Sequence, residues 1–394
     1  MRPPVDPDRD TARSAADGVT VQDAALSARE TAAQEAYWMA SQWQLMWRKF
    51  RRHHLALVGG AVLIVFYLLG IFCDFFSPYT IKERFQGLQN HPPSRIHWIA
   101  EGRLVGPYVY PTEQTLNPET FEATFTELTD IRYPIRFFTK GEEYRLLGLF
   151  PTRIRLYGVE RPAGIFLFGT DALGRDLLSR TLCGARISLS IGLVGVAISF
   201  LLGVVFGGIS GYFGGRADML IQRMIEFIIS IPTIPLWMGL AAALPKDWSV
   251  LQLYFGIVVI LSLVRWGSLA RVVRGKLLEL REHDFTMAAR LAGLRERAVI
   301  ARHLLPSFAS YLIVHLTLAI PDIILGETAL SFLGLGLRSP AVSWGVLLKA
   351  AQNVRSVAAY PWMLIPALFV IVTVMAFMFV GDGLRDAADP YRQR

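Results

Sequence analysis

Residues 55–76 read LALVGGAVLIVFYLLGIFCDFF, and Asp74 is their one charged side chain. A helix needs about 20 apolar residues, at ~1.5 Å rise each, to cross the hydrocarbon of a membrane. The stretch therefore predicts a transmembrane helix. Four basic residues lie at positions 48–52, just before it. Because basic flanks mark the cytoplasmic side of a span, we expect a cytoplasmic N-terminus.

The composition favours a membrane protein over a soluble one. Of 394 residues, 53% are hydrophobic and only 18% are charged, whereas soluble domains carry roughly 25% charge. The net charge of +8 is explained by basic cytoplasmic loops. We exclude nucleic-acid binding because no basic stripe is interleaved with base-stacking aromatic residues.

Five further apolar stretches predict an all-α membrane protein with about six transmembrane helices. The second is rich in glycine, which lets helix backbones approach closely in lipid. The third is interrupted by Pro232 and Pro235. We interpret the segment 321–360, whose second half is too polar to span, as re-entrant or interfacial on the outer side. The five stretches are 187–212, 219–244, 250–270, 304–320 and 361–380.

The distribution of charged and turn-forming residues then divides the chain into domains. Segment 271–303 holds eight basic against four acidic residues, so it should be cytoplasmic, together with both termini. Residues 77–165 are punctuated by proline and glycine between short alternating stretches, which indicates a β-rich insert outside the membrane. The expected domains are a tail at 1–54, the first helix at 55–76, the insert at 77–165, a core at 166–385 and a tail at 386–394.

The N-terminal tail contains two different parts. Residues 1–30 have almost no aromatic side chains, which is typical of disorder. From about residue 31 the pattern favours an amphipathic helix in the membrane interface, with Trp43 and Trp47 four residues apart. The alternative is a lead-in to the first membrane helix.

The chain offers little for bond chemistry. Cys73 and Cys183 are its only cysteines, each near the outer end of an apolar stretch, and helix packing is favoured over a disulfide between them. No spacing indicates a metal site or a catalytic nucleophile with its base. His91, His97, Glu101 and Asp130 make no convincing constellation in the insert. The phosphate-loop pattern is also missing, so we expect no ATP or other cofactor on this chain.

The most informative cytoplasmic segment is 284–306, which reads DFTMAARLAGLRERAVIARHLLP. Asp284 suits an N-cap, Gly293 suits a left-handed helix end, and Pro306 suits the first turn of the next span. These signals predict a compact helix pair joined rigidly to a membrane span. Such a pair can dock in a groove of a partner protein.

This segment resembles the EAA loop of ATP-binding-cassette (ABC) importer permeases, a pattern of Glu-Ala-Ala, three residues, Gly, nine residues and Ile-x-Leu-Pro. Met287 replaces the usual Glu, and His303 replaces Ile in the form familiar from peptide-type permeases. The resemblance assigns ATPase coupling to Ala288, Ala289, Arg290, Gly293, Arg302, His303, Leu305 and Pro306.

Further motifs resemble the dipeptide, oligopeptide and nickel branch of that family, specifically the permease type that carries GTDxxGRD before its second span. That outer segment contains Gly169, Thr170, Asp171, Gly174, Arg175 and Asp176. Motif positions in the spans are Arg223, Glu226, Pro232 and Glu327. From the residues alone, we favour capping and anchoring for 171–176, a local pair for Arg223 and Glu226, and helix packing or interfacial positions for His315 and Asp322.

The resemblance implies a type I ABC permease fold and a multi-pass subunit of the bacterial inner membrane without its own ATPase site. It implies a second homologous permease, two ATPase subunits, an extracytoplasmic solute-binding protein and surrounding lipid as partners. Small peptides are the substrates most often implied, with nickel and sugar-derived compounds also represented. The alternatives are a stand-alone secondary transporter, which would need an internal repeat that we do not see, and a membrane-bound enzyme.

Overall fold

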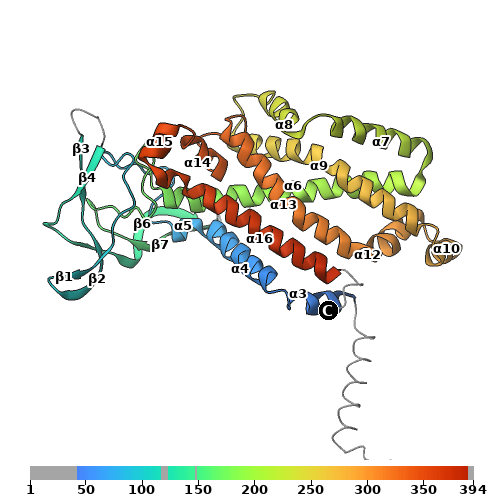
Figure 1. The fold of residues 1–394 in the computed structure, drawn as a ribbon, viewed down its shortest axis with the longest axis horizontal. Coiled ribbons are helices and arrows are strands. Elements are labelled where there is room, and N and C mark those ends of the chain that lie inside the picture. The colour runs from blue at the N-terminus through green and yellow to red at the C-terminus, as the bar shows by residue number, and fades with distance from the viewer. Residues whose placement is uncertain (1–41, 117–122, 147–148, 389–394) are drawn as a thin grey trace, which may run out of the picture.

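A computed structural model describes residues 42–116, 123–146 and 149–388 (Figure 1). The predicted disordered segment 1–30 lies outside these ranges. Before the insert come α3 (Gln42–Phe50), α4 (His54–Ile71) and α5 (Cys73–Phe76). After it come α6 (Leu177–Phe213), α7 (Gly215–Ser230), α8 (Thr233–Ala242), α9 (Val250–Leu280), α10 (Asp284–Leu291), α11 (Glu296–Val299), the π-helix η1 (Ile300–Leu304), α12 (Leu305–Ser307), α13 (Ala309–Phe332), α14 (Trp344–Ala350), α15 (Val354–Ala359), the 3-10 helix η2 (Pro361–Leu364) and α16 (Ile365–Ala388).

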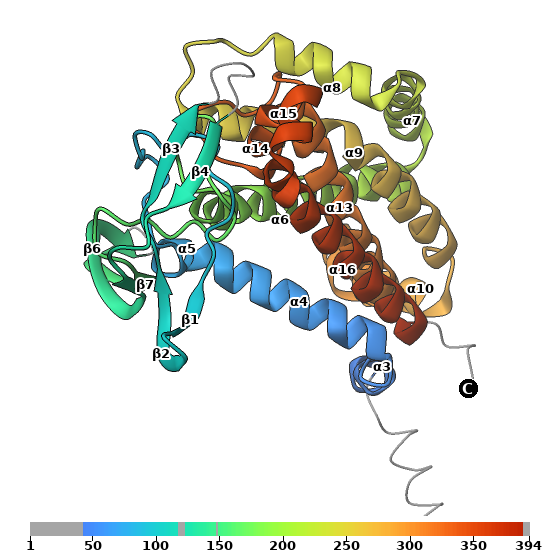
Figure 2. The ribbon, with the colours of Figure 1, turned by 60° about the vertical axis from the view of Figure 1, so that its left-hand side comes forward.

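The long helices form one bundle with different appendages at its two ends (Figures 1 and 2). Among the described residues, five helices are long and apolar enough to cross a membrane, and the pair α7 and α8 makes a sixth if counted as one span. This confirms the prediction of about six spans. We call the end that carries the insert the insert end, and the end that carries α10 to α12 the arm end.

The third span, predicted over 219–244 with interruptions at Pro232 and Pro235, is broken in the structure. Helices α7 and α8 meet at 90° across a short break. Pro232 stands at the N-cap of α8 with φ −54° and ψ 129°, outside helical geometry. The break follows because proline excludes the residue before it from helical conformation and cannot donate the hydrogen bond that would continue α7.

The fifth span differs from the prediction. We expected it over 304–320, ending at Pro321, but α13 runs on to Phe332 with Pro321 inside it. Proline removes a single backbone donor, and membrane helices tolerate this loss when neighbouring groups satisfy the freed carbonyl. The predicted re-entrant segment therefore shrinks to 333–360, where α14 and α15 lie at the insert end (Figure 1).

The first span is shorter than the predicted 55–76. Helix α4 ends at Ile71, and α5 follows after a break at Phe72. Before it, α3 packs Met46 and Phe50 in a small apolar cluster with α4 and α16. Trp43 and Trp47 stay about half exposed, which suits a helix lying at a membrane interface.

Helix α6 is central, because it contacts α4, α7, α9, α13 and α14. Its glycines allow α9 to approach closely. A Cβ added to Gly203 would lie 2.8 Å from the Leu269 Cβ, and one added to Gly207 would lie 2.6 Å from the Ala270 carbonyl oxygen. In lipid, apolar helix surfaces gain little by leaving the lipid acyl chains for another helix, so such close backbone packing is a main source of helix association.

The insert contains three small antiparallel sheets, as its turn-rich sequence predicts. The sheets pair β1 (His97–Ala100) with β2 (Arg103–Val109) and β5 (Tyr133–Pro134), β3 (Thr112–Leu116) with β4 (Ala123–Glu127), and β6 (Arg136–Leu146) with β7 (Phe150–Gly158). Arg155 on β7 donates hydrogen bonds to the carbonyl oxygens of Asp74 (3.2 Å) and Ser77 (2.9 Å). The β6–β7 hairpin is thus fixed to the end of the first span.

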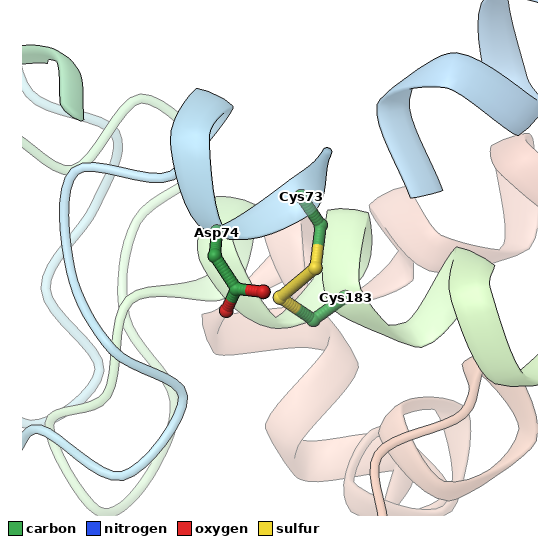
Figure 3. A group of neighbouring side chains, drawn as sticks. All are labelled: Cys73, Asp74 and Cys183. Atoms are coloured by element: carbon green, nitrogen blue, oxygen red, sulfur yellow. A yellow bond between two sulfur atoms is a disulfide. The ribbon is translucent and has the colours of Figure 1, made fainter. Parts of the chain in front are cut away.

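A disulfide joins the first two spans at the insert end. Cys73 on α5 and Cys183 on α6 are bonded, with their Cα atoms 5.1 Å apart (Figure 3), so the expectation of two separate packing residues is wrong. The Asp74 carboxylate lies beside the bond and accepts a hydrogen bond from Arg186 (2.8 Å). Because both sulfurs are bonded to each other and the Asp74 carboxylate is paired, the Cys73, Asp74 and Cys183 cluster links the first two spans covalently. It is not a ligand set for a metal ion.

The glycine contact predicts opposite outcomes for two adjacent substitutions. Gly207→Ala should lower stability by about 1–3 kcal/mol, because its methyl group would overlap the α9 backbone. Gly208→Ala should cost nothing and could add up to ~1 kcal/mol of helix propensity, because a Cβ there meets nothing within 4 Å. Thermal unfolding of the purified variants in one detergent tests this, and equal midpoints would contradict the packing role.

The Cys73–Cys183 disulfide predicts that two fragments of the chain stay linked after cleavage between them. A protease site inserted between Thr129 and Asp130, in an exposed loop of the insert, should yield one full-size band on a non-reducing gel and two fragments after reduction. Cys183→Ser in the same background should give two fragments in both gels. Separation of the parent fragments without reductant would show that the bond does not form.

Candidate functional site

The arm end carries the EAA-like segment as a compact helical arm. Helix α10 follows α9 after a short turn, and the Thr286 hydroxyl donates a hydrogen bond to the Leu280 carbonyl (2.8 Å). Gly293 has φ +78°, the left-handed conformation predicted from its position after the helix. The arm then turns through α11 and η1 into α12 and α13, so it is continuous with two membrane spans.

The arm is packed tightly against the ends of α6 and α9. Ala289 is 7% exposed and belongs to a cluster that includes Tyr212, Leu277 and Leu304. The Arg290 guanidinium lies 5.0 Å from the centre of the Tyr212 ring, and its Nε donates to the Tyr212 hydroxyl (3.1 Å). A force on the arm therefore reaches two spans through direct contacts.

The opposite face of α10 is apolar and exposed. Met287 and Leu291 are 54% and 89% exposed, and Ala288 is exposed beside them. Residues at i, i+1 and i+4 lie together on one side of a helix. This set, Met287, Ala288 and Leu291, is called the arm face below. An apolar face that is held outside the bundle by a rigid arm fits a groove in another protein.

The remaining coupling-motif residues sit on the same arm. Arg302 and His303 are exposed on η1, and Leu305 is partly buried. Pro306 was predicted in the first turn of the next span, but it lies in the short helix α12, and the span helix α13 begins only at Ala309. A second detail of the prediction was also wrong. The N-cap of α10 is His283 rather than Asp284, which is the first helical residue and makes no capping bond. Its carboxylate still lies where the helix dipole favours negative charge.

The outer motif lies at the other end of the bundle, far from the arm in sequence and in space (Figure 1). Asp176 is the N-cap of α6, where one carboxylate oxygen accepts the Ser179 N–H (2.8 Å). Asp171 accepts the N–H groups of Leu173 (2.8 Å) and Arg175 (3.0 Å), and it also pairs with the Arg175 guanidinium (2.7 Å). These bonds order the entry of α6.

The outer motif also fastens the insert to the bundle. Thr170 accepts the N–H of His91 (2.8 Å) and its own hydroxyl donates to the Leu88 carbonyl. Gly169 and Gly174 have φ values of +74° and +71°, and a side chain on Gly174 would overlap the Phe85 carbonyl oxygen. The glycines of the motif therefore allow the start of the insert to lie directly on the segment that leads into α6.

Glu327 holds a buried polar cluster between three helices. Its side chain is fully buried on α13 and accepts hydrogen bonds from Ser331 (2.7 Å), Ser343 (2.7 Å) and Ser188 (3.4 Å). The Ser188 hydroxyl in turn accepts the N–H of Trp344 (3.1 Å). The cluster thereby fixes the first turn of α14 against α6 and α13.

The other span motifs have local roles in the structure. Arg223 and Glu226 pair on one face of α7 at 2.7 Å, and both are largely exposed. Pro232 marks the bend before α8. Arg223, Glu226, Pro232 and Glu327 are therefore not gathered in one site, and none of them lies on the arm.

An ion pair between two apolar helices was not predicted from the sequence. Arg265 on α9 and Asp322 on α13 lie 2.6 Å apart. From the sequence we expected Asp322 and His315 to be packing or interfacial residues near the outer side, and we predicted no role for Arg265. A single arginine within the apolar stretch 250–270 was the available signal, because ionisable residues inside spans mark functional positions.

His91, His97 and Glu101 of the insert each have a different partner in the structure. His97 pairs with Glu127 (3.0 Å), Glu101 pairs with Arg132 (2.8 Å), and the buried His91 ring bonds to the Thr112 hydroxyl (2.9 Å). Burial lowers the pKa of His91 below its usual value. Among the described residues of the insert, these three side chains therefore belong to three separate structural contacts.

Comparison with known families identifies both ends of the chain. Residues 203–394 match the family "binding-protein-dependent transport system inner membrane component", and residues 41–93 match the "N-terminal TM domain of oligopeptide transport permease C". The first match contains the arm, and the second contains α3, α4 and the start of the insert.

Individual relatives agree with the family matches. The chain is 42% identical over 228 residues to the oligopeptide transport system permease protein OppC of Haemophilus influenzae, covering 58% of this chain and 71% of that protein. It is 30% identical over 350 residues to the dipeptide transport system permease protein DppC of Bacillus subtilis, covering 88% and 85%. It is 29% identical over 351 residues to OppC of Bacillus subtilis, covering 89% and 90%.

The Glu327 cluster predicts that shape and hydrogen bonding matter at this position. Glu327→Gln keeps a carbonyl oxygen for the serine hydroxyls and adds a donor that they can accept, so its stability should stay within ~1 kcal/mol of the parent. Glu327→Leu leaves buried hydroxyls without an acceptor, at about 1–3 kcal/mol for each group. Thermal unfolding in detergent distinguishes them, and a leucine variant as stable as the glutamine variant would refute the role of the cluster.

Proposed function

Because this chain belongs to the family of inner-membrane permease subunits of binding-protein-dependent ABC importers, we propose that the solutes it carries are small peptides. As a family member, it is a multi-pass inner-membrane protein that works with ATPase and solute-binding partners and has no ATPase site of its own. The peptide assignment is supported by relatives named as oligopeptide and dipeptide permeases, two of which match nearly 90% of this chain.

The arm end is assigned to the cytoplasm. Segment 271–303 carries eight basic against four acidic residues, and cytoplasmic loops near membrane spans are enriched in basic residues. Helix α3 and the C-terminal end of α16 lie at the same end of the bundle (Figure 1). Both termini are therefore cytoplasmic in this proposal. The insert end, with the Cys73–Cys183 disulfide, lies outside, where oxidising conditions favour the bond.

The single observation that carries the coupling proposal is the arm face on a rigid support. Met287, Ala288 and Leu291 present apolar surface away from the bundle, while Ala289 and Arg290 on the other side contact α6 and α9. An ATPase subunit holds the arm face in a groove. When ATP binding closes the ATPase pair, the arm moves as a rigid body and carries the attached spans with it.

The proposed complex contains this chain, a second homologous permease, two ATPase subunits and an extracytoplasmic binding protein. ATP is bound by the ATPase subunits, and this chain binds no cofactor. The insert end faces the binding protein, which delivers the peptide between the two permeases. Neither nucleic acid nor a metal ion takes part.

A charge on the arm face should break the ATPase contact. We expect Leu291→Asp to reduce ATPase recovery with the affinity-purified permease by at least about tenfold, because the docked surface would then bury an unpaired carboxylate. The side chain is 89% exposed, so permease stability should not change. ATPase recovered per permease is quantified after mild-detergent purification.

Leu149→Asp is the matched control. Leu149 is 73% exposed in the insert, on the far side of the bundle from the arm, so ATPase recovery should be unchanged. Equal recovery with Leu291→Asp and the parent chain would contradict the docking assignment. Loss with both variants would indicate a general defect of the complex.

A further inference from the structure

The ion pair between Arg265 and Asp322 lies where a charge is costly. Both residues are near the middle of their helices, α9 and α13, yet their side chains are 30% and 46% exposed. Charged side chains at the centre of a bilayer cost about 2.5–3.5 kcal/mol each even on lenient scales, and they face the bundle interior or water. The face that carries this pair is therefore turned away from lipid.

A cavity of about 630 Å³ adjoins the pair. Its walls are mainly apolar and include Ile228, Ile234 and Leu325, while Arg265 and Asp322 provide both signs of charge. A smaller cavity of about 130 Å³ lies against the same two residues and contains His315. Apolar walls with a few convergent polar groups, and volumes of about 300–1,000 Å³, are typical of small-molecule sites.

The bend between α7 and α8 adds polar groups to the larger cavity. Thr233, the first residue of α8, lines it, and broken membrane helices present their helix ends to solutes in this manner. Trp237 also lines it. Its side chain is 5% exposed, and its indole N–H is buried with no hydrogen-bond partner among the described residues. Gly326 leaves room for this ring, because a Cβ there would lie 2.9 Å from it.

We propose that this cavity is a binding site for the termini of a short peptide, with the carboxylate on Arg265 and the ammonium group on Asp322. The inference rests on the proposed function and specifies how the path recognises its solute. The ion pair opens, and each residue exchanges its partner for the opposite charge on the peptide. A zwitterion suits the site because it leaves no net charge.

Cysteine protection tests the site in the complete complex. The two native cysteines are bonded to each other, so Ile234→Cys introduces a single free thiol at a position that is 52% exposed and lines the cavity. We measure its labelling by a negatively charged methanethiosulfonate reagent in proteoliposomes, with dialanine or with N-acetyl-dialanine amide, which lacks both charges. Dialanine should slow labelling at least about tenfold more than the capped peptide.

Three control variants show whether the protection depends on this cavity and its charged pair. Leu68→Cys, on the exposed face of α4, should remain unlabelled by the charged reagent if that face meets lipid. Asp322→Asn combined with Ile234→Cys should lose the protection by dialanine. Glu279→Gln combined with Ile234→Cys should retain it, because the substitution removes only the exposed pair with Lys276 (2.9 Å) on the same helix α9.

Each of these results supports or overturns the peptide site. Equal protection by both peptides, or no protection by dialanine, overturns the site even if Asp322→Asn fails to assemble, because that comparison needs no charge variant. An unlabelled Ile234→Cys places this face against lipid and also overturns it. ATP-driven uptake of dialanine by the same proteoliposomes reports separately on the proposed function, so the two can fail independently.

Discussion

The close approach of α6 and α9 is the contact on which the rest of the structure depends. Gly203 and Gly207 remove the side chains that would separate the two backbones. Helix α6 then receives the disulfide and the outer motif at one end, the Glu327 cluster along its length, and the arm at the other end. Because membrane helices gain no hydrophobic free energy by leaving lipid for each other, such geometric fit decides which helices pair.

The same helix pair explains how an event outside the membrane can act within it. Arg290 and Ala289 hold the arm against Tyr212 of α6 and Leu277 of α9, and Arg265 lies on α9 farther into the bundle. The arm face and the proposed peptide site therefore belong to one continuous set of packed helices. In the proposed mechanism, movement of the arm would change the surroundings of the Arg265–Asp322 pair through these packed helices, with no separate relay.

Two acidic residues on α13 illustrate how burial separates structural from functional charge. Glu327 is fully buried, and serine hydroxyls on three sides satisfy it, so it can fix α14 but cannot meet a solute. Asp322 lies five residues earlier, keeps 46% exposure and borders two cavities. The sequence marks Glu327 through a family motif and gives Asp322 no such mark, although Asp322 has the better access to a solute.

The sequence by itself determined the membrane class, the number of spans, the β-rich insert, the arm and its Gly293 turn, because these follow from local composition, hydrophobic length and backbone preference. Tertiary structure decided the rest. Pro232 breaks a span whereas Pro321 does not, because the outcome depends on what surrounds the freed carbonyl. Cys73 meets Cys183, and Arg265 meets Asp322, only because helices distant in the sequence pack side by side, and no local pattern encodes which helix faces meet.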